Sequence, residues 1–225
     1  MKIRWNRSAL LFLTIALSAP FAIAQTSVAG SIYGAFNGST NGNGVQQSPA
    51  NQAGALFELR HISNAILGFE ATYSFNRADE TYTKQLPQPS LACPGTCEAV
   101  AETLQVPANA HEITVDWTPS LHFANFRPFG VLGLGVLLNV PSGSQTLTTI
   151  QGTLMSSQTV NDASTSTRAV YVYGAGLDWG LLPHLGLRVQ YRGNLYSAPD
   201  LSSLYSSTGS FTHSAEPMVG AYFNF

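Results

Sequence analysis

Positive charge is scarce in this chain. The sequence has ten Lys and Arg residues against twelve Asp and Glu, and Lys2, Arg4 and Arg7 are three of the ten. Residues 25–225 therefore hold seven basic and twelve acidic residues, a net charge of −5, with Lys84 as their one lysine. A nucleic-acid-binding protein needs a basic face. The sequence provides none, so we expect no nucleic acid partner.

Long apolar runs are also absent after residue 24, so no later segment is a candidate for a membrane helix. The chain starts with a positively charged segment, followed by an apolar stretch over residues 9–19 and by Ala22-Ile23-Ala24. This pattern predicts a secretory signal peptide over residues 1–24 and a mature domain over residues 25–225. An uncleaved anchor helix is the alternative, but the apolar stretch is shorter than the ~20 residues that span a membrane.

Cysteine is nearly absent, since Cys93 and Cys97 are the two in the chain. A protein exported through an oxidising compartment favours a disulfide, and Pro94-Gly95 favours a turn between the two sulfurs. We therefore predict a Cys93–Cys97 disulfide, with a redox-active pair as the alternative. No histidine lies nearby in the sequence to complete a metal site, and we expect no metal and no cofactor.

The chain instead shows apolar and polar residues in alternation, most clearly over its last ten residues. Every second residue there is apolar: Pro217, Val219, Ala221, Phe223 and Phe225. The residues between them are more polar: Glu216, Met218, Gly220, Tyr222 and Asn224. A period of two with unlike faces is typical of a β-strand. Together with the export signal, it indicates an outer-membrane β-barrel with a lipid-facing outer surface and a polar lumen.

Alternation and turn chemistry predict eight strands. They lie near residues 27–37, 52–61, 66–76, 110–118, 128–140, 168–180, 185–196 and 214–225. The connections are short at 61–65, 118–127 and 181–184, and long and polar at 38–51, 77–109, 141–167 and 197–213. We therefore predict an all-β fold, an eight-stranded antiparallel up-and-down transmembrane β-barrel with short periplasmic turns and long extracellular loops. The register of the fifth strand is the least defined, because both of its faces are apolar.

Aromatic residues fall at two levels of these strands. On the outward face, Phe69, Trp117, Trp179 and Phe225 lie near the periplasmic ends, and Phe36, Phe75, Tyr171 and Tyr173 lie near the outer ends. Two such belts are typical of the two membrane interfaces. The alternative is a soluble β-sandwich or lipocalin-like barrel, in which aromatic residues would be spread along the strands.

Four segments resemble the OmpA-like outer membrane β-barrel family of small eight-stranded proteins. They are Val28–Phe36, Arg127–Gly135, Tyr173–Trp179 and Pro183–Arg192. The resemblance implies a place in the bacterial outer membrane, with membrane lipids and the insertion machinery as partners. Phe223 and Phe225 resemble the assembly signal that this machinery reads. We expect a monomer, and the sequence does not identify an extracellular ligand.

Charged residues on the inward face predict a lumen network. They are Glu58, Arg60, Glu70, Glu112, Asp116, Asp178, Arg188 and Arg192. Ionised groups in a narrow lumen are costly unless they are paired or hydrated, so we expect opposite charges from different strands to meet. We place Arg60, Arg188 and Arg192 at the centre of a network that closes the lumen. Separate charges in a wet lumen are the alternative.

These features favour a non-enzymatic outer-membrane protein whose loops serve interaction, adhesion or envelope integrity. A narrow channel is one alternative, and a lipid-modifying enzyme is another. His213 and Ser214 invite comparison with the His/Ser/Glu set of barrel lipid hydrolases. Alternation puts these two side chains on opposite faces, so we predict no catalytic residues.

Overall fold

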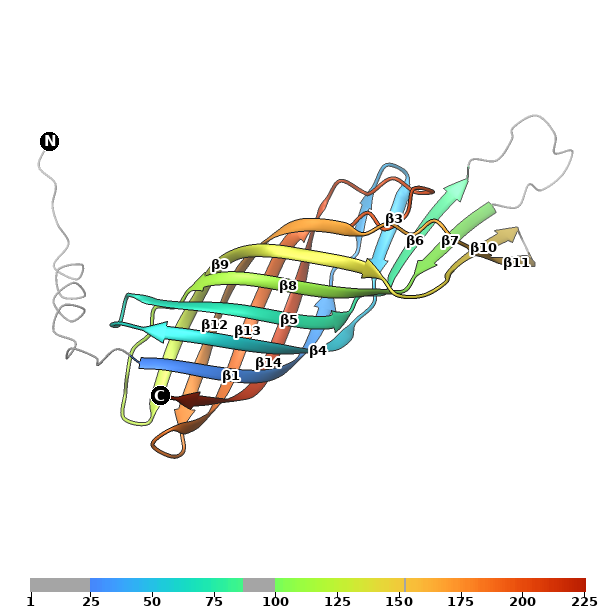
Figure 1. The fold of residues 1–225 in the computed structure, drawn as a ribbon. Helices are drawn as coiled ribbons and strands as arrows, with labels where there is room; N and C mark the ends of the chain where they lie inside the picture. The colour runs from blue at the N-terminus through green and yellow to red at the C-terminus, as the bar shows by residue number, and fades with distance from the viewer. Residues whose placement is uncertain (1–24, 87–99, 152) are drawn as a thin grey trace, which may run out of the picture.

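Eight long strands close into an antiparallel barrel in the order β1-β14-β13-β12-β9-β8-β5-β4 (Figure 1). This computed structural model describes residues 25–86, 100–151 and 153–225, so the predicted signal peptide and the predicted Cys93–Cys97 disulfide lie outside the described residues. The barrel strands are β1 (Gln25–Asn37), β4 (Gln52–Ile62), β5 (Gly68–Arg77), β8 (Ala108–Trp117), β9 (Phe126–Pro141), β12 (Ser166–Gly180), β13 (Leu185–Ser197) and β14 (Phe211–Asn224). No helix in these ranges is long and apolar enough to cross a membrane.

The eight-stranded antiparallel barrel predicted from alternation is confirmed. The start of β1 and the end of β14 lie at one end of the barrel, together with the short turns (Figure 1). The last residue is fastened there, since the Phe225 amide donates a hydrogen bond to the Thr26 carbonyl at 2.9 Å. Phe223 and Phe225 stack edge to face at this end with their ring centroids 5.4 Å apart. Their role as an assembly signal stays a prediction.

The outer surface of the barrel is apolar and the inner surface is largely polar. Alternate residues of β4 show the pattern: Phe57 and Leu59 are 61% and 54% exposed, whereas Glu58 and Arg60 are buried. Lipid covers the outward side chains of such a barrel, so their exposure carries no hydrophobic penalty. The two predicted aromatic belts also face outward, at Phe69, Trp117, Trp179 and Phe225 and at Phe36, Phe75, Tyr171 and Tyr173.

Pairing with β12 defines the register of β9. Phe129, Val131 and Leu137 point inward and are buried, while Leu132 and Leu134 point to lipid. The β9 strand is apolar on both faces because its inward residues form an apolar cluster with Val170, Val172 and Tyr196. The lumen therefore has an apolar strip beside its charges.

The long connections predicted as polar loops contain six further strands in the described chain. These six strands form one antiparallel sheet beyond the barrel, in the order β11-β10-β7-β6-β3-β2 (Figure 1). They are β2 (Thr40–Gly42), β3 (Val45–Pro49), β6 (Glu80–Leu86), β7 (Val100–Val106), β10 (Gln145–Gln151) and β11 (Leu154–Val160). We call this the outer sheet. The sequence did not predict it, because its pairs β3–β6 and β7–β10 join different connections and leave no local signal.

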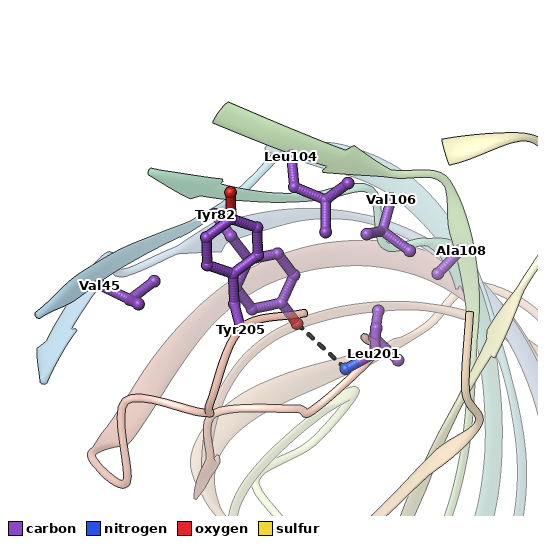
Figure 2. Close-up of a cluster of buried hydrophobic side chains, with 7 residues drawn as sticks. All are labelled: Val45, Tyr82, Leu104, Val106, Ala108, Leu201 and Tyr205. Carbon is purple, nitrogen blue, oxygen red and sulfur yellow. Dashed lines mark hydrogen bonds between the residues drawn. The ribbon is translucent and has the colours of Figure 1, made fainter. Parts of the chain in front are cut away.

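The outer sheet has an apolar core of its own (Figure 2). Val45, Tyr82, Leu104, Val106, Ala108, Leu201 and Tyr205 form it, and all are buried. The rings of Tyr82 and Tyr205 stack nearly parallel, with centroids 6.3 Å apart. Leu201 and Tyr205 belong to the fourth outer connection, residues 198–210, which thus covers one face of the sheet.

Polar contacts hold the fourth outer connection at both sides. On one side, the hydroxyls of Thr208 and Thr40 are hydrogen-bonded at 2.8 Å. On the other, Asp162 accepts hydrogen bonds from the Ser202 and Ser203 hydroxyls at 2.7 and 2.6 Å. These hydrogen bonds lower the pKa of the Asp162 carboxyl below its ordinary value, and the one from Ser203 has the larger effect. The connection therefore spans from the β2 side of the outer sheet to the segment after β11.

Candidate functional site

The lumen carries the densest group of charged side chains in the described part of the chain. At its centre, Arg188 of β13 binds Asp178 of β12 with two hydrogen bonds, Nε to Oδ1 at 2.6 Å and Nη2 to Oδ2 at 2.9 Å. Its third nitrogen, Nη1, reaches Glu58 Oε2 of β4 at 2.6 Å. Arg188 thus joins three strands, two of them adjacent and one across the lumen.

Arg60 lies beside this group and extends it. Its Nε donates to Glu70 Oε2 at 2.7 Å, and its Nη1 lies 3.3 Å from Asp178 Oδ2. The guanidinium carbon lies 3.9 Å from the centroid of the Phe129 ring, within the range of a cation–π contact. Asp178 therefore accepts from two arginines at once, which links the periplasmic half of the lumen into one cluster.

Arg192 continues the cluster toward the outer end. Its Nη1 lies 2.8 Å from Asp116 Oδ2 and 3.6 Å from Glu70 Oε1, so Glu70 is shared with Arg60. Its Nη2 lies 3.7 Å from Glu112 Oε1. The eight residues that the sequence assigned to a lumen network are thus brought together in one connected set. They come from β4, β5, β8, β12 and β13.

The sequence reasoning missed two members of this set. Asn194 Nδ2 donates to Glu112 Oε2 at 3.1 Å and to Glu216 Oε1 at 3.0 Å. Ser214 also donates to Glu216, at 3.2 Å. The signal was present, because Glu216 and Asn194 alternate in step with the inward residues Gly220 and Arg192.

Burial leaves these groups little room for water. Arg60, Arg188 and Arg192 are at most 1% exposed. Neighbouring glycines make space for them, since a Cβ at Gly133 would overlap the Asp116 carboxylate and a Cβ at Gly176 would overlap the Phe129 ring. An eight-stranded barrel holds side chains rather than an open pore. In this chain those side chains include the paired ions of the lumen network beside the apolar strip of β9 and β12.

The geometry around His213 does not form a nucleophile–base pair. His213 Nε2 is hydrogen-bonded to the Tyr173 hydroxyl at 2.8 Å, on the outward face. Ser214 is buried in the lumen beside Glu216. The described ranges also contain no group of three or more His, Cys, Asp or Glu side chains placed to hold a metal ion.

A closed antiparallel barrel with an apolar outer surface and a charged interior defines a transmembrane β-barrel. The chain belongs to the family described as the outer membrane protein beta-barrel domain, whose model matches residues 8–213. The protein is therefore an outer-membrane protein, as its resemblance to OmpA-like barrels implied. None of the curated proteins is detectably similar to it in sequence.

Several solved structures resemble the fold. One is Ail, the attachment invasion locus protein of Yersinia pestis, with 11% identity and a TM-score of 0.41 over 90% of this chain and 99% of that chain. Neisserial surface protein A has 14% identity and a TM-score of 0.43, also over 90% and 99%. The N-terminal β-barrel domain of Pseudomonas aeruginosa OprF has 13% identity and a TM-score of 0.37 over the same shares.

Proposed function

We propose that this protein is a non-enzymatic surface protein, in which a sealed barrel carries the outer sheet for contact with molecules outside the cell. The observation that carries the proposal is the β10–β11 hairpin, which lies at one edge of the outer sheet, away from the barrel (Figure 1). All residues of β11 before Val160 are exposed, including Leu154 and Met155 at 72% and 70%.

The hairpin has the properties of a recognition strand. It forms the edge of the outer sheet, so one side of β11 lacks a partner strand in the described chain. Natural proteins usually protect such edges with charge or proline. Residues 145–160 contain neither. An exposed, uncharged edge is the surface to which an extended segment of a partner can add as a further strand.

The sealed lumen supports display over transport. The lumen network joins opposite walls of the barrel, and the fourth outer connection covers one face of the outer sheet above it. No described feature favours the narrow channel. The separation of His213 and Ser214 onto opposite faces supports the non-enzymatic assignment.

The test replaces residues 147–158 by a short turn and compares two properties of cells that express the protein. Attachment to a panel of immobilised matrix proteins and glycans should fall, while resistance to sodium dodecyl sulfate should be unchanged. A fall in detergent resistance with normal attachment would assign the protein to envelope integrity instead.

A point variant sharpens the same test. Leu154→Lys adds a charge to the sheet edge without shortening it and should lower attachment. Leu204→Lys is the matched control, because Leu204 is also exposed on the outer side but lies in the fourth outer connection. Equal effects of the two variants would contradict a role for the hairpin edge.

A further inference from the structure

The periplasmic mouth of the barrel contains a cavity of about 370 Å³. Its walls come from the turn between β8 and β9, the turn between β12 and β13, and the end of β14. Hydrogen-bond donors line it, among them Arg127, His122, Asn125 and the Tyr222 hydroxyl, and no Asp or Glu does. The volume suits a small ion or a lipid headgroup rather than a single water molecule.

Arg127 makes no ion pair with any described carboxylate, in contrast to Arg60, Arg188 and Arg192. Its cross-strand neighbour is Asp178, on the paired position of β12. Both oxygens of that carboxylate are already occupied, by Arg188 and by Arg60. Arg127 is thus an inward guanidinium that lies beside Asp178 without forming an ion pair with it.

The charges of the lumen are also unevenly distributed along its axis. Toward the outer end, Arg192 forms ion pairs with Asp116 and Glu112, and Glu216 is its cross-strand neighbour on β14. Toward the periplasmic end, Arg60, Arg188 and Arg127 are accompanied by Glu58, Glu70 and Asp178, so the acidic excess of the lumen lies toward its outer end. At the mouth itself Arg127 lines the cavity and no carboxylate does, and a guanidinium in such a place attracts anions.

The rim of the cavity is apolar. Phe126, Leu181 and Leu182 line it and are 45%, 46% and 63% exposed. Phe126 stacks on Trp179 of the periplasmic aromatic belt, with centroids 5.9 Å apart. A guanidinium at the membrane interface beside exposed leucines fits a phosphate group whose acyl chains lie against the outer wall of the barrel.

We infer that the periplasmic mouth is an anion site for a phosphate group, supplied by an inner-leaflet phospholipid or by free phosphate, with Arg127 as its anchor. Guanidinium binds phosphate through two parallel hydrogen bonds, which a lysine cannot reproduce. The site goes beyond the display function, because it lies at the opposite end of the barrel from the outer sheet.

Two arms of one experiment test the site on the full protein purified from outer membranes into a glucoside detergent free of phosphate. In the first, inorganic phosphate is titrated by calorimetry. In the second, native mass spectrometry measures the retention of phosphatidylglycerol against diacylglycerol with the same chains. Retention of phosphatidylglycerol alone identifies the lipid as the source, and binding of inorganic phosphate alone identifies the free ion.

Arg127→Gln should weaken binding in either arm about tenfold or more, the effect of losing a charged hydrogen-bond donor. Arg77→Gln is the matched control, because Arg77 is an exposed arginine at the outer end, and it should bind as the wild type does. If Arg127→Gln fails to fold, His122→Ala in the exposed turn should weaken binding to a smaller degree. Absence of binding to the wild type in both arms, or unchanged binding to the folded variants, would overturn the site.

Discussion

The barrel lumen and the outer sheet bury side chains of opposite character. Both are antiparallel β-structure with one buried face, but the lumen buries arginines and carboxylates, whereas the outer sheet buries Tyr82, Leu104 and Val106. The difference follows from what surrounds each region. Lipid takes up the apolar face of the barrel, so the polar face turns inward, while water around the outer sheet drives its apolar face inward.

The two interiors are therefore stabilised by different forces. In the outer sheet, stability comes from apolar area removed from water and from close packing. In the lumen, the cost of removing ions from water is offset when each ion is paired and hydrogen-bonded. A lumen of this kind depends on complete pairing, so its members should act as a unit rather than independently.

The largest effect is expected from breaking one lumen pair. Arg188→Met leaves Glu58 buried without its arginine and removes one of the two arginine partners of Asp178. Removing one partner of a buried pair costs about 3 to 5 kcal/mol. The measurement is the urea midpoint of the folded, heat-modifiable form in detergent.

The double variant Arg188→Met/Glu58→Gln is the control for that loss. Because it removes the unpaired carboxylate together with the arginine, it should be more stable than Arg188→Met alone. If the stability losses of Arg188→Met and Glu58→Gln were additive in the double variant, the lumen charges would act independently. The lumen would then not depend on complete pairing, as we infer from its contrast with the outer sheet.

A cavity in the outer sheet should have a smaller and local effect. Leu104→Ala removes a fully buried side chain from the apolar core, at a cost of about 3 kcal/mol. We expect faster proteolysis within the outer sheet and an unchanged urea midpoint for the barrel. A matched drop in barrel stability would mean that the two regions form one cooperative unit.

The outer sheet should also respond to pH through Glu80. Burial raises the pKa of Glu80 to about 8 from an ordinary value of 4.5, against the opposing hydrogen bond from Gln47. Between these values the folded protein keeps a proton that the unfolded chain releases, so the stability of the outer sheet should fall as the pH rises through this range.

Hydrogen exchange in the outer sheet at about pH 5 and about pH 9 measures this effect after correction for the intrinsic exchange rate. Glu80→Gln stays neutral at both values and should remove the difference. A wild-type sheet equally protected at both pH values would contradict the buried, protonated state of Glu80.

The smallest effect is expected at the contact between the outer sheet and the fourth outer connection. The Tyr82 hydroxyl donates to the Pro199 carbonyl at 3.0 Å. The same hydroxyl accepts from the Leu201 amide at 3.2 Å (Figure 2). Tyr82→Phe should lower stability by about 1 kcal/mol and speed exchange of the Leu201 amide. Tyr205→Phe is the control, since its hydroxyl contacts Glu102 instead and the Leu201 amide should keep its protection.

The eight barrel strands could be predicted from the sequence because each carries its own alternating pattern. Leu185, Leu187 and Val189 of β13 point outward, and Arg188 and Gln190 point inward, as alternation requires. The predicted connection at 181–184 likewise matches the turn between β12 and β13, whereas the one at 61–65 only overlaps the turn between β4 and β5, at residues 63–67. Local periodicity was sufficient wherever one face meets lipid and the other does not.

The outer sheet could not be predicted in the same way. Tyr82 and Leu104 are paired across β6 and β7, and Leu104 is paired in turn with Leu147 of β10. These contacts join residues far apart in the sequence, and the strands that carry them are short. In the lumen, alternation identified most of the charges that point inward, although Glu216 and Arg127 were missed. Which arginine meets which carboxylate depends on the positions of opposite walls.

Conductance of the wild-type protein in planar bilayers tests most directly whether paired ions seal the lumen. We expect no steady single-channel conductance for the wild type, because the lumen network links opposite walls of the barrel. The Arg188→Met variant, with one link removed, should show more frequent openings. Steady wild-type conductance that Arg188→Met leaves unchanged would contradict the seal.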